Sequence, residues 1–561
     1  MYSSAPKGKT TRGVWLIITL GLLLLPAILR GGLALDDEQL LFENPVTSGA
    51  LPWTAAFTRD YFHHISDSGQ WRPVASLSLR LDRMIFDRWI VGFHLSNWAM
   101  HMALVALLWA LLRQLRITGP GACFGIVVFA LHPALADSIV WISGRTSMLS
   151  ALFPVAGMLI SCRWSSAGRS PMCCALPAAV GLMAGLLAKE DALVFAVAIP
   201  LVASSCRRTN LKAASLATTV TVLLWCACRS LALGAALPSA ASPIMGAASL
   251  GERLAVGGAA ILEALHLFIL PASYPPQYQV SFLLERHSSM PLAIVATCGW
   301  TLLWLPIILF VWKRKTASTA LASTALAALA FLPVTQIVPL GEVFAPRFLY
   351  LPLLFLVPFI GAVAARLVPD KFGFAAVCGL ALILAGASYQ RAKVYSSRSA
   401  WRSEVLRHMP NDVPSWNDLG LLREEQGDPA GARAAWRYAI ELDPQYSRSW
   451  SNLGRLQLEQ KEWLAAEISL REALRHGPRN AIPRVNLASL LAKQDRHREA
   501  VAFYQEATQL SPGLAPAWRG LAMSLDKLQR HSEARTALKR ALVLDPANEK
   551  TQTLMRLFQS L

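Results

Sequence analysis

The chain has 561 residues, of which 54% are hydrophobic and only 16% are charged, and its formal net charge at pH 7 is +18. This composition is too apolar for a soluble protein of this length and too polar for a protein embedded throughout in a membrane, so it predicts a combination of both. Many basic residues stand at the ends of apolar runs, as in the cytoplasmic loops of membrane proteins, so the charge does not call for a nucleic-acid partner. The nine cysteines form no disulfide framework and have no metal-ligand spacing.

The first apolar run, at about 13–30, follows a short basic stretch at the N-terminus. Its length is close to the roughly 20 residues that span a bilayer. No small-residue cleavage site follows it, so we expect a retained membrane helix rather than a signal peptide. A basic N-terminus stays in the cytoplasm, so this helix would carry the acidic residues Asp36, Asp37 and Glu38 to the outer face of the membrane.

Apolar runs of spanning length alternate with short polar joins as far as about Gln390. Twelve crossings would return the C-terminus to the cytoplasm, whereas the basic clusters fit eleven crossings and place it outside. The segment expected not to cross is Ala255–Leu270, which carries Glu263 and His266 and would be re-entrant or lie along the surface. The expected segments are 13–30, 89–112, 120–140, 146–161, 172–188, 191–205, 213–229, 254–271, 291–312, 317–340, 348–365 and 373–388, and the basic clusters include Arg207/Arg208/Lys212 and Lys313/Arg314/Lys315.

A repeat begins soon after Trp401, where mixed charges become dense. Proline recurs every 34 residues at positions 444, 478, 512 and 546, which is the period of the tetratricopeptide repeat (TPR), a helix–turn–helix unit. We predict three parts: a membrane domain at 1–395, a linker helix at 396–412, and four TPR units with a closing helix at 413–561. The array would offer a concave surface to an extended peptide or a partner protein, unless it serves only self-assembly or stability. Two alanine series keep the same period: Ala432, Ala466, Ala500 and Ala534, and Ala439, Ala473, Ala507 and Ala541.

Several charged residues of the membrane half fall on the expected outer face, where each is a functional candidate because ionisable groups at membrane depth are costly. Arginine forks and a lysine suit a lipid-linked phosphate. A carboxylate can take a proton from an attacking hydroxyl. The set therefore predicts group transfer from a polyprenyl-phosphate donor to a hydroxyl outside the cytoplasm, against the alternative that these residues are solvated helix ends and headgroup anchors. The members are Asp36, Asp37, Arg72, His132, Asp137, Arg145, Lys189, Glu190 and Arg347.

The motifs occur in the order DD, RP…LS.R, FHL.N…H, HP….D…GR, KE and RFLYLP, followed by the repeats. This order resembles the transmembrane and TPR repeat-containing protein O-mannosyltransferases and their bacterial relatives, which belong to the C-type glycosyltransferase (GT-C) superfamily. The resemblance implies an all-α, polytopic GT-C domain of about 11–12 membrane segments followed by a TPR α-solenoid. It also implies inverting transfer of a sugar, mannose foremost, from a polyprenyl-phosphate donor to serine or threonine hydroxyls of extracytoplasmic proteins. A bacterial-type relative would lie in the inner membrane with its repeats on the extracytoplasmic side.

Carried over residue by residue, the resemblance implies two groups of site residues. Beyond the lipid-linked donor no cofactor is expected, and the sequence leaves a divalent metal open without indicating one. The chain departs from the family pattern in three places: Asp137 stands where glutamate is usual, Ser147 follows the GR motif where aspartate is common, and Pro346 precedes the RFLYLP arginine where glutamate is common. Which of Asp36 and Asp37 is the base stays open, as do the sugar and the acceptor. The catalytic group is Asp36, Asp37 and Asp137; the donor phosphate-binding group is Arg72, His132, Arg145, Lys189, Glu190 and Arg347.

Two rival functions fit the same sequence. One is a non-catalytic membrane scaffold whose repeats recruit envelope proteins, and the other is a GT-C transferase that acts on a lipid or glycan. On the main hypothesis the partners are the polyprenyl-phosphate sugar, an acceptor polypeptide or partner protein in the TPR groove, and membrane lipid, with no nucleic acid.

Overall fold

The computed structural model describes residues 7–62, 69–205, 211–234, 248–271, 273–286, 319–336, 342–545 and 549–559. The chain divides into two compact units, Met1–Glu404 and Val405–Leu561. Every regular element within the described residues is helical, which confirms the predicted all-α class. The expected segment 291–312, the basic clusters at 207–208 and 313–315 and the proline at 546 lie outside the described residues.

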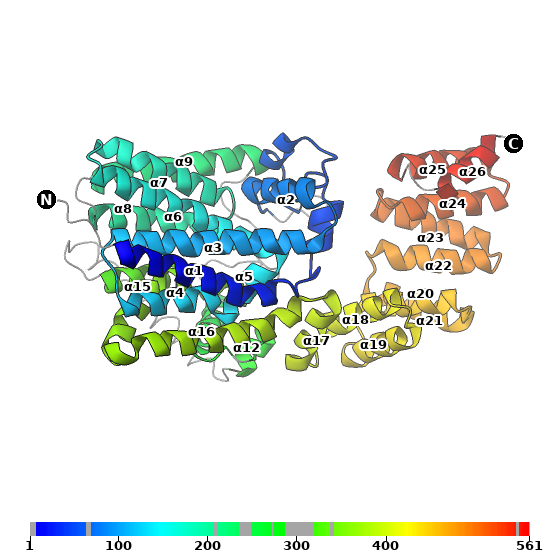
Figure 1. Cartoon of the computed structure of the whole chain (residues 1–561). Helices are drawn as coiled ribbons and strands as arrows, with labels where there is room; N and C mark the ends of the chain where they lie inside the picture. Colours follow the sequence, from blue (N-terminus) through cyan, green and yellow to red (C-terminus); the bar gives the residue numbers. More distant parts are fainter. Residues whose placement is uncertain are drawn as a thin grey trace. The chain divides into compact units, whose positions relative to one another are not determined.

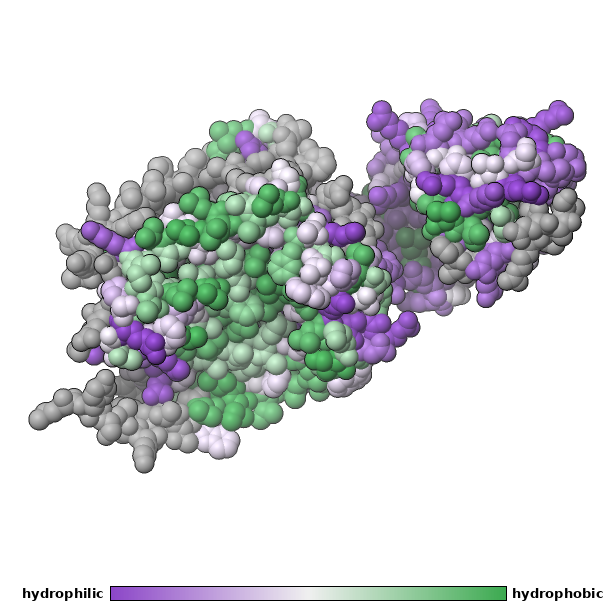
Figure 2. Space-filling view, turned by 90° about the horizontal axis from the view of Figure 1, so that it is seen from above, coloured by the Kyte–Doolittle hydropathy of each residue, from purple (hydrophilic) through white to green (hydrophobic). Residues whose placement is uncertain are grey.

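The long helices of the first unit lie side by side (Figure 1). Five of the described helices are long and apolar enough to cross a membrane, or six if one bent pair counts as a single span. Figure 2 shows a broad hydrophobic surface over this unit, as lipid contact requires. The unit is therefore a membrane domain, and its candidate spans are Ile90–Gln114, Ile142–Ser166, Leu211–Leu233, Pro346–Leu367 and Lys371–Tyr395.

Other helices of this unit are shorter or more polar than those spans. The α11 helix (Leu250–Ile269), which covers the segment expected not to cross, is not among the candidate spans. Its Glu263 is fully buried and pairs with Tyr278 and Arg286. The number of crossings stays a prediction. The remaining helices include α1 (Lys7–Ile28), α7 (Pro171–Leu186), α8 (Phe195–Ser205), α12 (Val280–Arg286) and α14 (Thr319–Ala330).

The expected span at 120–140 is not a straight helix, because the chain bends by 42° within it, as in a broken span or a re-entrant loop. The α4 helix (Pro120–Leu131) ends at His132, a 3₁₀ turn covers Pro133–Leu135, and α5 (Ala136–Val140) follows. Proline has no N–H to continue the helix and drives the residue before it toward extended backbone. His132 accordingly has φ −67° and ψ 126°. This break brings the residues after it to the candidate site.

A short amphipathic helix, α2 (Pro73–Phe86), lies at one end of the long helices (Figure 1). It buries Leu79 and Asp82 and leaves Leu81 and Met84 exposed. An apolar face left exposed on a short helix is typical of a helix lying in the membrane interface. The buried face of α2 contributes directly to the candidate site.

The second unit is the predicted series of helix pairs with a closing helix. The members of both alanine series are 0% exposed, so small side chains allow the paired helices to approach closely. Trp416, Trp450 and Trp518 each donate the indole N–H to a proline carbonyl six residues earlier, at 2.7–2.9 Å. The pairs are α18 (Val413–Glu425) with α19 (Pro429–Leu442), α20 (Ser447–Glu459) with α21 (Trp463–His476), α22 (Ala481–Lys493) with α23 (His497–Leu510), and α24 (Ala515–Lys527) with α25 (His531–Leu544), followed by α26 (Glu549–Gln559).

The α17 helix (Arg398–His408) lies where the two units meet in the sequence. It covers most of the stretch predicted as a linker helix. The α16 helix (Asp370–Ala392) and a 3₁₀ turn at Lys393–Tyr395 precede it.

Candidate functional site

The two aspartates predicted as catalytic lie in a tight turn after α1. Leu35 has a φ of +49°, a left-handed conformation that costs energy in a residue with a branched side chain. Asp37 is fully buried, and its Oδ2 accepts from the backbone N–H of Ala34 at 3.1 Å. Asp36 is half-buried. The strained turn therefore gives the two neighbouring carboxylates different surroundings.

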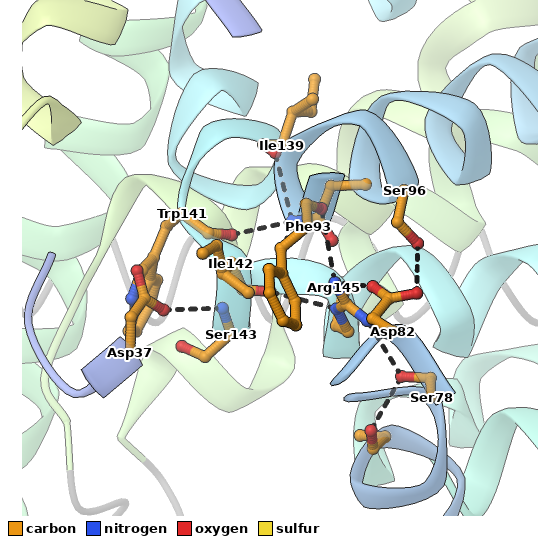
Figure 3. A network of polar contacts seen from close by, with 12 residues as sticks. Asp37, Ser78, Asp82, Phe93, Ser96, Ile139, Trp141, Ile142, Ser143 and Arg145 are labelled. Atoms are coloured by element: carbon orange, nitrogen blue, oxygen red, sulfur yellow. Dashed lines mark hydrogen bonds and ion pairs between the residues drawn. The ribbon is translucent and has the colours of Figure 1, made fainter. Parts of the chain in front are cut away.

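Ser143 binds both carboxylates (Figure 3 shows its bond to Asp37). Its backbone N–H donates to Oδ1 of Asp37 at 3.0 Å, and its hydroxyl donates to Oδ1 of Asp36 at 3.1 Å. Asn97 of α3 (Ile90–Gln114) holds the same loop, because its amide lies 3.0–3.3 Å from the carbonyls of Ile139, Trp141 and Ile142. The loop after the break is thus fixed against the acidic turn.

Gly144 is required next to Ser143 for a steric reason. A Cβ at this position would lie 2.7 Å from the carbonyl oxygen of Ser138 and 2.8 Å from that of Asp137. Both distances are shorter than a carbon atom tolerates, so a larger residue would push the loop away from the acids. The GR motif therefore keeps a glycine because the loop folds tightly on itself.

Arg145 does not face the acidic turn. Its guanidinium is fully buried and forms an ion pair with Asp82 of α2 at 2.7 Å (Figure 3). Its Nε also donates to the carbonyl of Ile142 at 3.3 Å. Arg145 fastens α2 and the start of α6 (Arg145–Ser166) to the Ser143 loop, and these contacts occupy it structurally.

Arg72 and Arg347 are the cations that act on Asp36. Burial raises the pKa of Asp36 to about 6 from 3.8, although the Ser143 hydroxyl, Arg347 and Arg72 each lower it. Burial, and then the charge of Asp36, raise the pKa of Asp37 well above its usual range. Asp36 therefore has a pKa just below neutral pH and lies within electrostatic range of two arginines.

Each basic residue of the site is held by a nearby carboxylate. Arg72 lies 3.4 Å from Oε1 of Glu190, and Arg347 pairs with Glu342. The Arg347 guanidinium also lies over the Trp141 ring, 4.7 Å from its centroid. Carboxylates and rings of this kind fix the direction of a guanidinium. The pairing of Arg72 with Glu190 joins two of the predicted residues.

Lys189 lies in the same segment as Glu190. Its Nζ donates to the Ser147 hydroxyl at 2.9 Å and lies 2.9 Å from Oδ2 of Asp191. Ser147 occupies the position where relatives of the expected family often carry aspartate, so the lysine keeps a polar contact there and takes its charge partner from Asp191.

Asp137 and His132 belong to a different set of contacts. Asp137 is fully buried and lies 3.4 Å from Nε of Arg391, whose guanidinium also sits 3.8 Å from the ring centroid of Tyr274. His132 accepts from the backbone N–H of Ala134 at 3.2 Å, and its other ring nitrogen lies 3.3 Å from the carbonyl of Phe268. Both ring nitrogens are occupied, so His132 stabilises the break between α4 and the 3₁₀ turn.

The structure thus brings Asp36, Asp37, Arg72 and Arg347 into one electrostatic group, places Asp137 in electrostatic range of the same Arg347, and gives Arg145 and His132 supporting positions. Sequence reasoning missed the partners Ser143, Asp82 and Arg391. Ser143 lies within a motif given above and Asp82 closely follows another, whereas the contact of Arg391 with Asp137 joins positions 254 residues apart. No three His, Cys, Asp or Glu side chains of the described ranges could together hold a metal ion.

The fold and this charged group define a helical membrane protein that carries a tetratricopeptide array. Profiles of the tetratricopeptide repeat family match residues 417–481, 465–515 and 491–557. Among solved structures, the crystal structure of MamA matches this chain with 22% sequence identity and a TM-score of 0.24. The match covers 27% of this chain and 84% of the MamA chain.

Among characterised proteins the chain is similar to protein O-mannosyl-transferases. It is 32% identical to the protein O-mannosyl-transferase Tmtc2 of Drosophila melanogaster over 176 residues. This alignment covers 29% of this chain and 19% of the relative. A Caenorhabditis elegans protein O-mannosyl-transferase is 23% identical over 465 residues, 80% of this chain and 65% of the relative. The chain spans less than two thirds of the length of these curated relatives. The predicted resemblance to the TPR-containing O-mannosyltransferases is confirmed.

Proposed function

We propose that this chain is a membrane glycosyltransferase that moves a sugar, mannose foremost, from a polyprenyl-phosphate donor to a serine or threonine hydroxyl of an extracytoplasmic protein. The observation that carries the proposal is the position of Asp36, a half-buried carboxylate fixed by Ser143 and flanked electrostatically by Arg72 and Arg347. The similarity to named O-mannosyl-transferases supports the same class of reaction.

Asp36 is the proposed general base. A pKa near 6 leaves it ionised at neutral pH but still basic enough to accept a proton, which is the compromise that general-base catalysis requires. The acceptor hydroxyl attacks the anomeric carbon from the side opposite the phosphate, its proton passes to Asp36, and the bond between that carbon and the phosphate oxygen breaks. Asp37, held on both oxygens by backbone N–H groups, positions the turn.

The leaving phosphate gains negative charge in this step, so cations near it stabilise the transition state. Arg72, Arg347 and Lys189 are the proposed donors to its oxygens. Glu190 and Glu342 orient the two arginines before the donor arrives. Arg145 stabilises the Ser143 loop through its buried ion pair with Asp82. Asp137 pairs with Arg391 near the end of α16 and so holds that end of the helix.

The TPR array is the proposed acceptor-binding part. Four helix pairs offer the surface that such arrays use for extended peptides. Binding the acceptor there would raise its effective concentration at the membrane site. This requires the TPR array and the candidate site to face the same side of the membrane, and we propose the extracytoplasmic side of a bacterial inner membrane. A reporter fused at the C-terminus that is active only outside the cytoplasm is expected to be active; cytoplasmic activity would contradict this topology.

Comparative glycoproteomics tests the proposal in cells. A strain lacking the gene is complemented with the wild type or with Asp36→Asn. Glycosylated serine or threonine sites are expected to disappear without the gene and to return only with the wild type. If protein glycosylation is unchanged but a glycolipid is lost, the acceptor is a lipid or glycan. If Asp36→Asn restores everything, the chain acts as a scaffold and the catalytic proposal is wrong.

A further inference from the structure

Arg229 is a fully buried arginine whose hydrogen-bonding capacity is largely unused. It lies on α9 (Leu211–Leu233), is 1% exposed, and donates through one terminal nitrogen to the carbonyl of Gly69. Its Nε and other terminal nitrogen have no acceptor among the described residues. Arginine stays protonated in proteins, and a buried donor left without an acceptor destabilises the fold. The position therefore calls for an acceptor that the described residues do not supply.

Two more buried hydrogen-bond donors near the candidate site also lack an acceptor among the described residues. The Nε of Arg72 and the hydroxyl of Tyr61 are buried and have no hydrogen-bond partner in the described parts of the chain. Tyr61 is 2% exposed, and the Arg72 guanidinium lies 5.7 Å from its ring centroid. Buried polar groups are almost always satisfied, so three such residues in one region call for a partner that the described residues do not include.

The three residues are linked through Glu190 and through the described residues 60–62 and 69–70. Glu190 pairs with Arg72 and lies, with Arg72, within electrostatic range of Arg229. Asp60 is also in range of Arg229, but its two oxygens accept from the backbone of Phe62 at 2.7 Å and Gln70 at 2.6 Å. Glu190 thus engages Arg72 and Asp60 engages the backbone of Phe62 and Gln70, so the remaining donors have no partner in the part of the chain that the structure describes.

We propose that Arg229, with Arg72 and Tyr61, binds the phosphate of a lipid-linked donor, so that the membrane helix α9 supplies a phosphate-binding residue that no sequence motif indicated. A phosphate offers several strong acceptor oxygens at one point, which is what converging guanidinium and hydroxyl donors require. The inference rests on the proposed function and extends its donor site from the loops onto α9.

The surroundings of α9 favour a lipid phosphate over a free one. An apolar hollow of about 220 Å³ lies between α8, α9 and α14, with Val197, Leu201, Leu326 and Leu329 among its lining residues. The N-terminal half of α9 lines this hollow, and the C-terminal end of the same helix carries Arg229. An isoprenoid chain lying along α9 would fill apolar space while its phosphate reached Arg229.

Ligand binding to the full-length chain in detergent tests the inference without requiring activity. The probes are an isoprenyl phosphate, the isoprenol of the same length, inorganic phosphate, and phosphatidylglycerol. We expect the isoprenyl phosphate to bind best and Arg229→Gln to weaken its binding by about tenfold or more, as loss of a charge-assisted hydrogen bond does. Tyr61→Phe should weaken it by about threefold. Arg366→Gln, a change at an exposed arginine, should leave it unaltered.

Wild-type affinity in Arg229→Gln would overturn the inference. Equal binding of inorganic phosphate or phosphatidylglycerol would overturn the assignment to a lipid-linked donor. If Arg229→Gln does not fold, Arg229→Lys decides: it keeps the charge but offers fewer directed donors, so affinity should fall by about threefold, and an unchanged value would contradict the proposal. If the wild type binds the isoprenyl phosphate through Arg229 but transfers no sugar, the proposed function alone is contradicted. If Arg229→Gln transfers sugar with an unaltered KM for the donor, only this inference is contradicted.

Discussion

Asp37 and Ser143 lie 106 positions apart in the sequence, yet the backbone N–H of Ser143 donates to Oδ1 of Asp37 at 3.0 Å. Because the adjacent hydroxyl holds Asp36, this one contact fixes the register between the acidic turn and the loop after the broken helix. The geometry of the candidate base therefore depends on a residue outside the acidic motif.

Removing that hydroxyl gives the first prediction. Ser143→Ala keeps the backbone bond to Asp37 but loses the bond to Asp36, so the base is less well oriented. We expect kcat for sugar transfer to fall by about tenfold, with little change in thermal stability. Ser143→Thr retains a hydroxyl and should recover part of the rate. Equal kcat in wild type and Ser143→Ala would show that Asp36 needs no such orientation.

The buried ion pair between Arg145 and Asp82 gives a stability prediction. Asp82→Asn leaves the fully buried guanidinium without a charge partner, and breaking one side of such a pair costs about 3–5 kcal/mol. The matched control is Asp87→Asn, since Asp87 also pairs with an arginine of α2 but its side chain is 79% exposed. Exposed pairs contribute about 0–1 kcal/mol, so the control should unfold near the wild-type temperature. Similar melting temperatures for the two variants would refute the structural role of Arg145.

The pKa of Asp36 predicts opposite effects of pH on rate and on stability. The catalytic form is the carboxylate, so kcat/KM should rise as the pH increases through about 6 and level off above it. The pKa is raised by folding from 3.8, so the folded state favours the protonated acid. The stabilising effect of protonation is complete below the unfolded pKa and disappears as the pH rises through about 6.

This stability effect can be isolated with Asp36→Asn, which cannot titrate. Thermal unfolding of wild type and variant is compared at pH 7 and pH 5. The wild type should gain stability relative to the variant on going from pH 7 to pH 5, because Asp36 takes up a proton in that window and the asparagine does not. A constant difference between the two melting temperatures would mean that folding does not raise the pKa of Asp36.

The repeat array gives a packing prediction that is independent of catalysis. Ala500 in α23 is 0% exposed, and leucine there would overpack the helix pair at a cost of about 1–3 kcal/mol. Ala502 of the same helix is exposed and serves as the control. Chemical denaturation of the full chain, followed by fluorescence, should show earlier loss of the repeat signal for Ala500→Leu only. Equal midpoints for Ala500→Leu and Ala502→Leu would contradict the packing.

The features that depend on short-range contacts were the ones that the sequence predicted best. The repeat array follows from a period of 34 residues, because each helix pair repeats the same short-range contacts, such as each tryptophan N–H with a proline carbonyl six residues earlier. The acidic turn was found because a charge at a helix end is visible in the sequence.

What the sequence could not predict depends on packing between distant segments. Arg145 looked like a phosphate ligand, since nothing in its motif shows that Asp82 of α2 would occupy it. Arg229 looked like the end of a membrane helix, and it becomes a candidate through its buried donors, which have no acceptor within the described residues. The break at His132 was readable in principle, because Pro133 follows it.

The central claim, that Asp36 is the base of a sugar transfer, is tested most directly by an assay with purified protein. The full-length chain in liposomes is supplied with polyprenyl-phosphate mannose and acceptor peptides rich in serine and threonine, and transfer is measured for wild type, Asp36→Asn and Glu38→Gln. Glu38 belongs to the same acidic run, but its side chain is 46% exposed and pairs with Arg398. The account predicts transfer by the wild type and Glu38→Gln and a loss of about 10²-fold or more in Asp36→Asn. Transfer by Asp36→Asn at the wild-type rate would contradict it.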